Sequence, residues 1–406
     1  MRIAQGGGDL HMHVLYVIDS LERVGGAEQG LASMAPHLIR SGVRLDIAYL
    51  VDSEGFQPEL AAAGATLFGV HRAGRSGRVR GLYELLRERR PDLVHTTLFE
   101  SDVLGRSAAL AARVPVVSSL VNSSYGPEHV HARGLSPWKV RAAQAVDGVT
   151  AQGTRRFHAL TRHVAGAMSR RLRISPDRID VIPRGRDPEL LGTADPERRA
   201  KVRASLGLPQ EVPLVLAAAR QQYQKGLDVL LESWPRVRRA VPEAVLLLAG
   251  GPGAETARLR ALAEAADGGA APASDGSTGS VRFLGARTDV FDLMAASDVF
   301  TAPSRWEGLG SAAMEAMGVG VPLVCSDVPA LRETVGSEEY ASLVPPERPE
   351  ELADALVATL EHTEAAQRRV EAARARFLAF FTLQRVTGRT VDFYERSLGA
   401  RGRGGR

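Results

Sequence analysis

Two carboxylates, Glu307 and Glu315, stand on either side of a glycine-containing turn in the stretch EGLGSAAMEA. Ser311 is placed to cap a helix that would carry Glu315 about one turn in. Carboxylates at such a point can accept hydrogen bonds from sugar or ribose hydroxyls, and a helix N-terminus favours phosphate. The plain alternative makes Glu307 a surface acid and Glu315 an acid that complements the helix dipole. The chain has 47 acidic residues, so the spacing of this pair alone does not distinguish the two interpretations, and the surrounding sequence has to.

Two cations, Arg220 and Lys225, flank a loop in AAARQQYQKGLD (217–228), between a predicted strand and a predicted helix. Two positive charges beside the start of a helix suit a diphosphate. An earlier turn carries the adjacent glycines Gly25 and Gly26, which let a backbone approach a ligand closely. The alternatives are two solvated loop charges at the first turn and a tight turn without a ligand at the second.

The elements that must position these residues are short apolar strands that alternate with helical stretches. Continuous apolar runs joined by helices favour parallel sheets covered on both faces. Such sheets bind ligands at the carboxyl ends of their strands, where the turns described above would lie. The predicted strands are HVLYVI (13–18), RLDIAYLV (44–51), DLVH (92–95), VPVVSSL (114–120), RIDVIP (178–183), VPLVLAA (212–218), AVLLLAG (244–250), VRFLG (281–285), DVFTAP (298–303) and VPLVCSD (321–327).

The strand pattern restarts after a connector at 183–201, which predicts two βα arrays in series. We place an N-terminal domain at 12–186, a C-terminal domain at 187–380 and a last helix at 381–398, followed by a tail at 399–406 that we expect to be disordered. The Gly/Ser/Ala-rich segment 267–280 is expected to be a mobile surface loop.

The segment RRFHALTRHVAGAMSRRLR (155–173) is predicted to form a basic helix with Phe157, Leu160, Val164 and Met168 along one side. An ordinary packed helix with a solvated basic face is the favoured interpretation. Peripheral contact with an anionic membrane surface is the less favoured alternative.

Composition restricts the class of protein. A chain of 406 residues suits two domains, and 44% hydrophobic but only 5% aromatic residues favour packed α/β layers. The single cysteine, Cys325, excludes an internal disulfide and a multi-cysteine zinc site, which favours the cytoplasm. No apolar run is long enough for a membrane helix, and the first residues lack the apolar core of a secretory signal. A net charge of +4 does not indicate a nucleic-acid partner.

The sequence resembles the family 4 glycosyltransferases of GT-B architecture from about residue 13 to 396. The most specific portion is APSRWEGLGSAAMEAMGVGVPLVCSD (302–327), which is similar to the family pattern of Pro-Ser, Glu-Gly, Glu-Ala and Gly-x-Pro before a strand. Weaker matches are GGAE (25–28), the Arg-x4-Lys-Gly element in 218–231, the glycine turn LLLAGGPG (246–253) and VRFLGARTDV (281–290). The resemblance implies two Rossmann-like, doubly wound parallel-sheet domains that face a central cleft.

The resemblance also implies roles for individual residues. Arg220 and Lys225 would hold the donor diphosphate, Glu307 the hydroxyls of the donor sugar, and Glu315 the ribose. The implied catalytic residues are Glu307, Lys225 and Arg220, and the implied donor-binding set is Gly25, Gly26, Arg220, Lys225, Arg287, Glu307, Gly308, Leu309, Gly310 and Glu315. The last helix would cross back to pack on the N-terminal domain.

Two positions depart from the family pattern. Many relatives place a histidine after the strand at 114–120, where this chain has Val121 and Asn122, and the usual Asn-Gly after VIP is Arg184-Gly185 here. Both departures concern the acceptor side. The candidates for that side are His95, Asn122, His129 and His131, although a histidine is more commonly structural or merely exposed.

The resemblance implies a retaining, metal-independent hexosyltransferase that uses a UDP- or GDP-hexose as co-substrate, without a cofactor, and a hydroxyl acceptor. The acceptor is a lipid, a polysaccharide or a small metabolite. The alternatives are a nucleotide-sugar epimerase and a non-catalytic nucleotide-sugar-binding protein. The absence of an Asp-x-Asp motif argues for transfer without a metal, and the composition suggests a GC-rich bacterial source. The sequence carries no signal of oligomeric state.

Overall fold

The computed structural model describes residues 12–23, 25–126, 136–267 and 279–399. Within these ranges the chain forms two compact units, one of the described residues up to 185 together with 383–399 and one of those in 186–382. Most of the segment predicted to be a mobile loop and all but the first residue of the predicted disordered tail lie outside the described residues.

Unit 1 is a seven-stranded parallel sheet with strand order β3-β2-β1-β4-β5-β6-β7. Its strands are β1 (Met12–Ile18), β2 (Val43–Tyr49), β3 (Thr66–Gly69), β4 (Leu93–Thr97), β5 (Val116–Leu120), β6 (Arg156–Ala159) and β7 (Ile179–Val181). Its helices are α1 (Gly26–Arg40), α2 (Gln57–Ala62), α3 (Gly74–Arg89), α4 (Phe99–Ala112), α6 (Pro137–Gln152), α7 (Arg162–Leu172) and α17 (Leu383–Leu398), with a short 3-10 turn, η1 (Pro176–Arg178).

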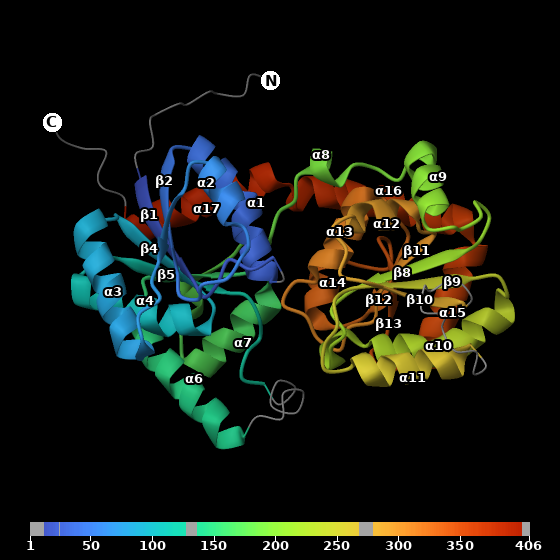
Figure 1. Cartoon of the computed structure of the whole chain (residues 1–406), viewed down its shortest axis with the longest axis horizontal. Helices are drawn as coiled ribbons and strands as arrows, with labels where there is room; N and C mark the ends of the chain where they lie inside the picture. Colours follow the sequence, from blue (N-terminus) through green and yellow to red (C-terminus); the bar gives the residue numbers. More distant parts are fainter. Residues whose placement is uncertain (1–11, 24, 127–135, 268–278, 400–406) are drawn as a thin grey trace. The chain divides into compact units, whose positions relative to one another are not determined.

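The two faces of the unit 1 sheet have separate cores. On one face, Tyr16 and Ile18 of β1 pack against α1 and against Phe393 and Tyr394 of α17. On the other, the alternate residues of β1 pack against α3 and α4. The C-terminal helix α17, drawn in red in Figure 1, therefore completes the N-terminal unit, alongside α1.

Unit 2 repeats the arrangement with a six-stranded parallel sheet of order β10-β9-β8-β11-β12-β13. Its strands are β8 (Leu214–Ala218), β9 (Val245–Ala249), β10 (Val281–Gly285), β11 (Val299–Ala302), β12 (Leu323–Ser326) and β13 (Ser342–Val344). Its helical elements are α8 (Pro188–Leu191), α9 (Pro196–Ser205), η2 (Tyr223–Lys225), α10 (Leu227–Ala240), α11 (Thr256–Ala266), α12 (Val290–Ala296), α13 (Ser311–Val319), α14 (Pro329–Val335), α15 (Pro349–Glu361) and α16 (Thr363–Phe380). Trp234 of α10 is fully buried in one core of this unit, against β8 and β9.

One predicted element is wrong. Residues 156–159 form strand β6, between β5 and β7, and the helix α7 begins only at Arg162. The side chain of Thr161 accepts a hydrogen bond from the backbone N–H of Val164 (3.1 Å) and so caps α7. Phe157 is fully buried because it lies in the sheet, so it does not continue an apolar stripe of the helix.

In each sheet the strand order reverses at one point, between β1 and β4 in unit 1 and between β8 and β11 in unit 2. At such a point the loops that leave the two neighbouring strands turn to opposite faces, which opens a crevice at their carboxyl ends. The fold therefore offers one potential ligand site in each unit.

Candidate active site

The carboxyl edge of the unit 2 sheet brings together the most specific motif of the sequence and one of the weaker matches, the Arg-x4-Lys-Gly element. Lys225 lies in the loop after β8 and Glu307 in the loop after β11, and Lys225 Nζ is 2.6 Å from Glu307 Oε1. The hydroxyl of Ser304 donates to the same carboxylate oxygen (2.8 Å). The side chains of Lys225 and Glu307 are 21% and 11% exposed, so the ion pair is largely buried but still open to a ligand.

Glycines set the positions of these loops through close backbone packing. Gly226 has a φ of +62°, and a Cβ there would lie 2.0 Å from the carbonyl oxygen of Pro303. The loop after β9 is held in the same way, since a Cβ on Gly250 would lie 1.9 Å from the oxygen of Ala219. No side chain fits in either place, so the loops after β8, β9 and β11 meet through their backbones.

The start of α13 differs in one detail from the prediction. Gly310, with a φ of +82°, is the N-cap residue, and Ser311 is the first residue of the helix rather than its cap. A Cβ on Gly310 would lie 2.3 Å from Leu331 Cδ2, so the side chain of α14 closes over this turn. Gly308 and Leu309 are buried, and the carbonyl oxygen of Leu309 accepts a hydrogen bond from Thr334 (2.6 Å).

Glu315 lies inside α13 and is held by a residue that the sequence did not indicate. Arg186 Nε donates to Glu315 Oε1 at 2.7 Å, and the two side chains are 3% and 10% exposed. A carboxylate this deeply buried needs a charged partner. The pair joins positions 129 residues apart, and no local pattern could have identified it.

The remaining donor-side residues lie at the surface of unit 2. Arg220, after β8, is exposed and forms no side-chain hydrogen bond or ion pair with the described part of the chain. Arg287, after β10, forms two hydrogen bonds with Asp289 (2.8 and 2.6 Å). The structure thus brings Lys225 and Glu307 into contact, but not these two arginines.

The contacts of Arg305 with the segment around Lys225 were also not predicted from the sequence. Both terminal nitrogens of Arg305 donate to the carboxylate of Asp228, at 2.8 Å each, and its guanidinium carbon lies 3.8 Å from the centre of the Tyr223 ring. Burial works to raise the pKa of Asp228, but the hydrogen bonds and charge of Arg305 outweigh it and hold the pKa below its ordinary value. Arg305 therefore connects the loop after β11 to the loop after β8.

In unit 1 the predicted glycines lie at the start of α1, with charged groups against them. A Cβ on Gly25 would lie 1.7 Å from Glu28 Oε2, and a Cβ on Gly26 would lie 2.6 Å from Arg184 Nη1. Glu28 is buried, and burial raises the pKa of its carboxyl group. The flexible ends of two charged side chains therefore cover this turn, and they could shift to admit a larger residue at either glycine.

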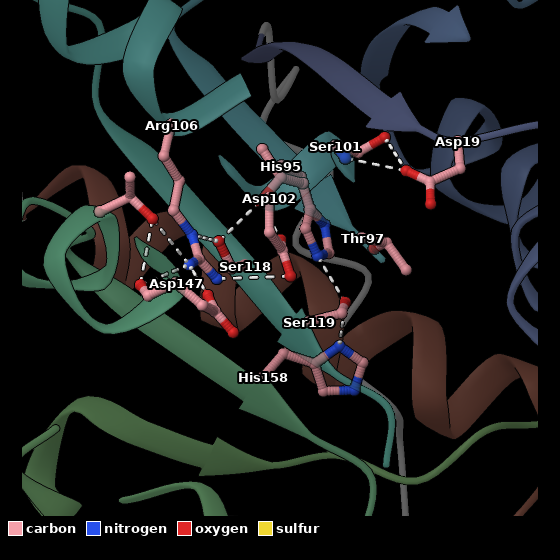
Figure 2. Close-up of polar contacts among 12 residues, drawn as sticks. Asp19, His95, Thr97, Ser101, Asp102, Arg106, Ser118, Ser119, Asp147 and His158 are labelled. Carbon is pink, nitrogen blue, oxygen red and sulfur yellow. Dashed lines mark hydrogen bonds and ion pairs between the residues drawn. The ribbon is translucent and has the colours of Figure 1, made fainter. Parts of the chain in front are cut away.

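His95, expected on the acceptor side, is a core residue of β4 with no exposed surface. Its Nδ1 lies 2.7 Å from the Tyr394 hydroxyl. Its Nε2 lies 2.8 Å from Ser119 Oγ (Figure 2). Ser119 in turn lies 3.2 Å from Nδ1 of His158, which occupies β6. This placement favours a structural role for His95, which is linked through Ser119 to His158.

The other acceptor-side candidates are only partly described. Asn122 follows β5, and its side-chain oxygen accepts a hydrogen bond from the backbone of Ser123 (2.9 Å). His129 and His131 lie outside the described residues.

A second polar cluster, shown in Figure 2, lies on the opposite face of the same sheet. Arg106 is fully buried and donates to Asp147 (2.5 Å) and Ser118 (2.8 Å). Asp102 lies 3.4 Å from the same guanidinium, and burial raises the pKa of Asp102 to about 7. The cluster joins α4, α6 and β5 and has a structural role.

Two absences concern the described residues alone. In that part of the chain no group of three or more His, Cys, Asp or Glu side chains is arranged to hold a metal ion. Among the helices that the structure describes, none has the length and apolar character required to cross a membrane.

Comparison with known proteins gives consistent matches along the chain. Residues 24–190 match the family model "Glycosyltransferase Family 4", and residues 212–362 match the model "Glycosyl transferases group 1". The 2-deoxystreptamine N-acetyl-D-glucosaminyltransferase of Streptomyces fradiae is 31% identical over 302 residues, which are 71% of this chain and 67% of that protein. A D-inositol 3-phosphate glycosyltransferase of a Nocardioides species is 28% identical over 313 residues, which are 75% of this chain and 67% of that protein.

Solved structures show the same fold. Anabaena HepE in complex with UDP-glucose superposes with a TM-score of 0.81 at 23% identity, over 95% of this chain and all of HepE. The sucrose-phosphate synthase of Thermosynechococcus elongatus gives 0.76 at 20% identity, over 96% of this chain and all of that one. The two-domain α/β architecture is therefore the GT-B fold, and the chain belongs to the family 4 glycosyltransferases.

Proposed function

We propose that the protein is a retaining glycosyltransferase that moves a hexose from a nucleoside-diphosphate sugar to a hydroxyl acceptor without a metal ion. The observation that carries this proposal is the contact between Lys225 and Glu307 at the crevice of unit 2. A cation and a carboxylate from two loops lie together at the strand ends where a parallel sheet binds its ligands. A diphosphate and a sugar hydroxyl are the groups that such a pair can hold together.

We assign the donor to unit 2. Arg220 and Lys225 bind the diphosphate, Glu307 accepts from the sugar hydroxyls, and Glu315, oriented by Arg186, accepts from the ribose. The backbone N–H groups at the start of α13 (Leu309 and Gly310), with Gly308 in the turn, complete the phosphate side, and Arg287 lies near the base. Solved structures of this fold in complex with UDP and UDP-glucose support a nucleotide sugar as donor, and we propose a UDP- or GDP-hexose.

The chemistry requires charge stabilisation on the leaving diphosphate. The bond between the anomeric carbon and the phosphate oxygen breaks, and its electron pair remains on the diphosphate. The acceptor oxygen bonds to the same carbon from the same face, and its proton passes to the departing phosphate oxygen. Arg220, Lys225 and the dipole of α13 can stabilise this developing negative charge, which is why a metal is not required in the proposal.

A thermal-shift series with UDP, GDP and their hexose conjugates tests the donor assignment. A ligand at 100 times its Kd stabilises the folded state by about 2.7 kcal/mol, so a true donor gives a clear, concentration-dependent shift. The absence of a shift with every nucleotide would contradict the proposal. Product analysis then separates transfer from epimerisation, because an epimerase changes the sugar without a second substrate.

A further inference from the structure

Helix α6 carries apolar side chains on its exposed side. Five of them fall within an arc of roughly 100° around the helix axis, since successive residues are about 100° apart. These five residues, which we call the α6 stripe, are Trp138, Ala142, Ala145, Val146 and Val149. All are exposed, and Trp138 and Val149 are 67% and 74% exposed. The opposite side of the helix carries Asp147, which is buried against Arg106.

The α6 stripe continues onto α4. A Cβ on Gly153, directly after α6, would lie 2.6 Å from Leu110 Cδ2, and Leu110 is itself 47% exposed. Figure 1 shows α6 at the edge of unit 1, where it packs on α4 and α7. Single exposed apolar residues are ordinary on a protein surface, but a row of them along one helix indicates a contact surface. The high exposure of the stripe makes this surface a ridge.

Basic side chains flank the α6 stripe on both sides. Lys139 and Arg141 fall at opposite edges of the arc, by the same helical spacing. The basic end of α7 lies along the Arg141 edge, because the side chain of Gln144 donates to the carbonyl oxygen of Arg171 (2.8 Å). Lys139, Arg141 and Arg173 are exposed and form no ion pair within the described part of the chain. Their charges are therefore available to a partner.

The charge of this region has one sign. Residues 136–173, which include α6, β6 and α7, contain eight basic residues and one acidic residue. The acidic residue, Asp147, is buried, and one of the basic residues, Arg156, is paired with Asp180 (2.8 Å). The stretch has a net charge of +7 against +4 for the whole chain, so the rest of the sequence is net negative. The ridge therefore lies in the positive part of a chain whose remainder is acidic.

An anionic lipid surface matches these features better than a protein does. A second copy of the chain would place one positive surface against another. A bilayer surface accommodates a ridge without a matching groove, since apolar side chains insert between its headgroups. Anionic lipids attract the basic residues that flank such a helix. Tryptophan on the apolar face and Lys or Arg beside it are typical of a helix that lies in the plane of the headgroups.

The apolar residues predicted along 155–173 do not belong to this surface. Phe157, Leu160, Val164 and Met168 are all buried within unit 1. Helix α7 therefore adds positive charge beside α6, and the apolar contacts come from α6.

We propose that α6 binds the surface of a membrane that contains anionic lipids. The helix lies parallel to the membrane plane, with Trp138, Val146 and Val149 between the headgroups. Lys139 and Arg141 contact lipid phosphates on either side. This binding is independent of the proposed glycosyl transfer and of the donor site in unit 2.

Co-sedimentation of the full chain with lipid vesicles tests the proposal. Vesicles of equimolar phosphatidylcholine and phosphatidylglycerol should bind the parent protein at least about tenfold more tightly than vesicles of phosphatidylcholine alone. The double variants Trp138→Ser/Val149→Ser and Lys139→Gln/Arg141→Gln should each weaken binding to the anionic vesicles about 10- to 30-fold. Added salt should weaken the binding of the parent, because it screens the attraction of the basic residues.

Matched changes on unit 2 provide the control. Leu190 is 69% exposed on α8, and Lys201 is exposed on α9. Leu190→Ser/Lys201→Gln should bind both kinds of vesicle as the parent does. Every variant replaces exposed side chains, so melting curves followed by circular dichroism should match that of the parent.

Trp138 also reports its own insertion. The chain has three tryptophans, of which Trp234 is fully buried and Trp306 is partly buried. Anionic vesicles should therefore shift the emission of the parent to shorter wavelengths as Trp138 leaves water. Trp138→Phe keeps an aromatic ring, so it should abolish this shift and keep vesicle binding within about threefold.

Three results would overturn the proposal. The first is equal binding of the parent to both kinds of vesicle, or binding to neither. The second is binding to anionic vesicles without an emission shift, because charge alone then holds the protein and the α6 stripe stays in water. The third is a dimer in the absence of lipid that Trp138→Ser/Val149→Ser dissociates, because the stripe then binds a second copy. The nucleotide titrations do not depend on any of these results, so failure of this proposal is distinguishable from failure of the donor assignment.

Discussion

Replacing Lys225 by methionine removes the ammonium group and keeps most of the length of the side chain. Its Nζ lies 2.6 Å from Glu307 Oε1, and in the described part of the chain Ser304 would still donate to that oxygen. Losing a hydrogen bond to a charged group costs about 1.5–3 kcal/mol, and the partial exposure of both side chains places the expected loss near the lower end. For a unit of this size, that predicts a fall in Tm of roughly 3–8 °C.

The loss of activity should be much larger than the loss of stability. In the proposed mechanism Lys225 stabilises charge that develops as the diphosphate departs. Removing one preorganised donor of this kind lowers kcat by about 100- to 1,000-fold. The assay follows nucleotide release from the sugar conjugate that gives the largest thermal shift, with and without acceptor. Lys201→Met, an exposed change on α9, is the matched control and should leave turnover unchanged.

The double variant Lys225→Met/Glu307→Gln separates structural from catalytic importance. With both charges removed, no unpaired carboxylate is left in the crevice, so most of the lost Tm should return. Turnover should not return. If turnover recovers with stability, or if Lys225→Met alone remains within threefold of the parent, the pair merely holds two loops together and the catalytic assignment is refuted.

Three other changes follow from the geometry. Arg186→Gln should raise KM for the donor more than it lowers kcat, because Glu315 loses the partner that orients it; equal kinetics in steady-state assays would contradict this. Gly226→Ala should lower the urea midpoint of unfolding, since alanine is strained at a φ of +62° and would meet Pro303; an unchanged midpoint would oppose the packing argument. The folded state holds the pKa of His158 at about 4, below its ordinary value of 6.5. It therefore binds fewer protons than the unfolded chain between these values, so the free energy of unfolding falls by up to about 3 kcal/mol as pH drops from 6.5 to 4. Urea titrations across this range should show a shallower pH dependence for His158→Gln, and an identical dependence would exclude this residue as a cause.

The central strands could be predicted from the sequence because each is a continuous apolar run between helical stretches. Two of the four edge strands, β3 and β13, were not predicted and are only four and three residues long, whereas the other two edge strands, β7 and β10, were predicted. Strand β6 was missed for a different reason. Phe157 and Leu160 coincide with helical spacing to Val164, and only the capping threonine, Thr161, marks where the helix begins. A capping residue inside an apparently continuous stripe is the signal that could have corrected the prediction.

The motifs of the candidate site could be located from sequence, but their partners could not. Glycines and charges after predicted strands identified the loops of Lys225 and Glu307. The arginines that hold the neighbouring carboxylates, Arg186 for Glu315 and Arg305 for Asp228, are 129 and 77 residues away from them in the chain. Such pairs depend on the tertiary fold, which brings the two ends of each contact together.

The glycines explain why the motifs of unit 2 occur as a set. The backbone of a neighbouring loop occupies the place of a Cβ at Gly226, at Gly250 and at Gly253, where the oxygen of Gln221 would lie 2.3 Å away. Any side chain at these positions would push the loops after β8, β9 and β11 apart. Because Lys225 precedes Gly226 directly, the distance from its ammonium group to Glu307 depends on that packing. The backbone packing around Gly226 therefore positions the ion pair.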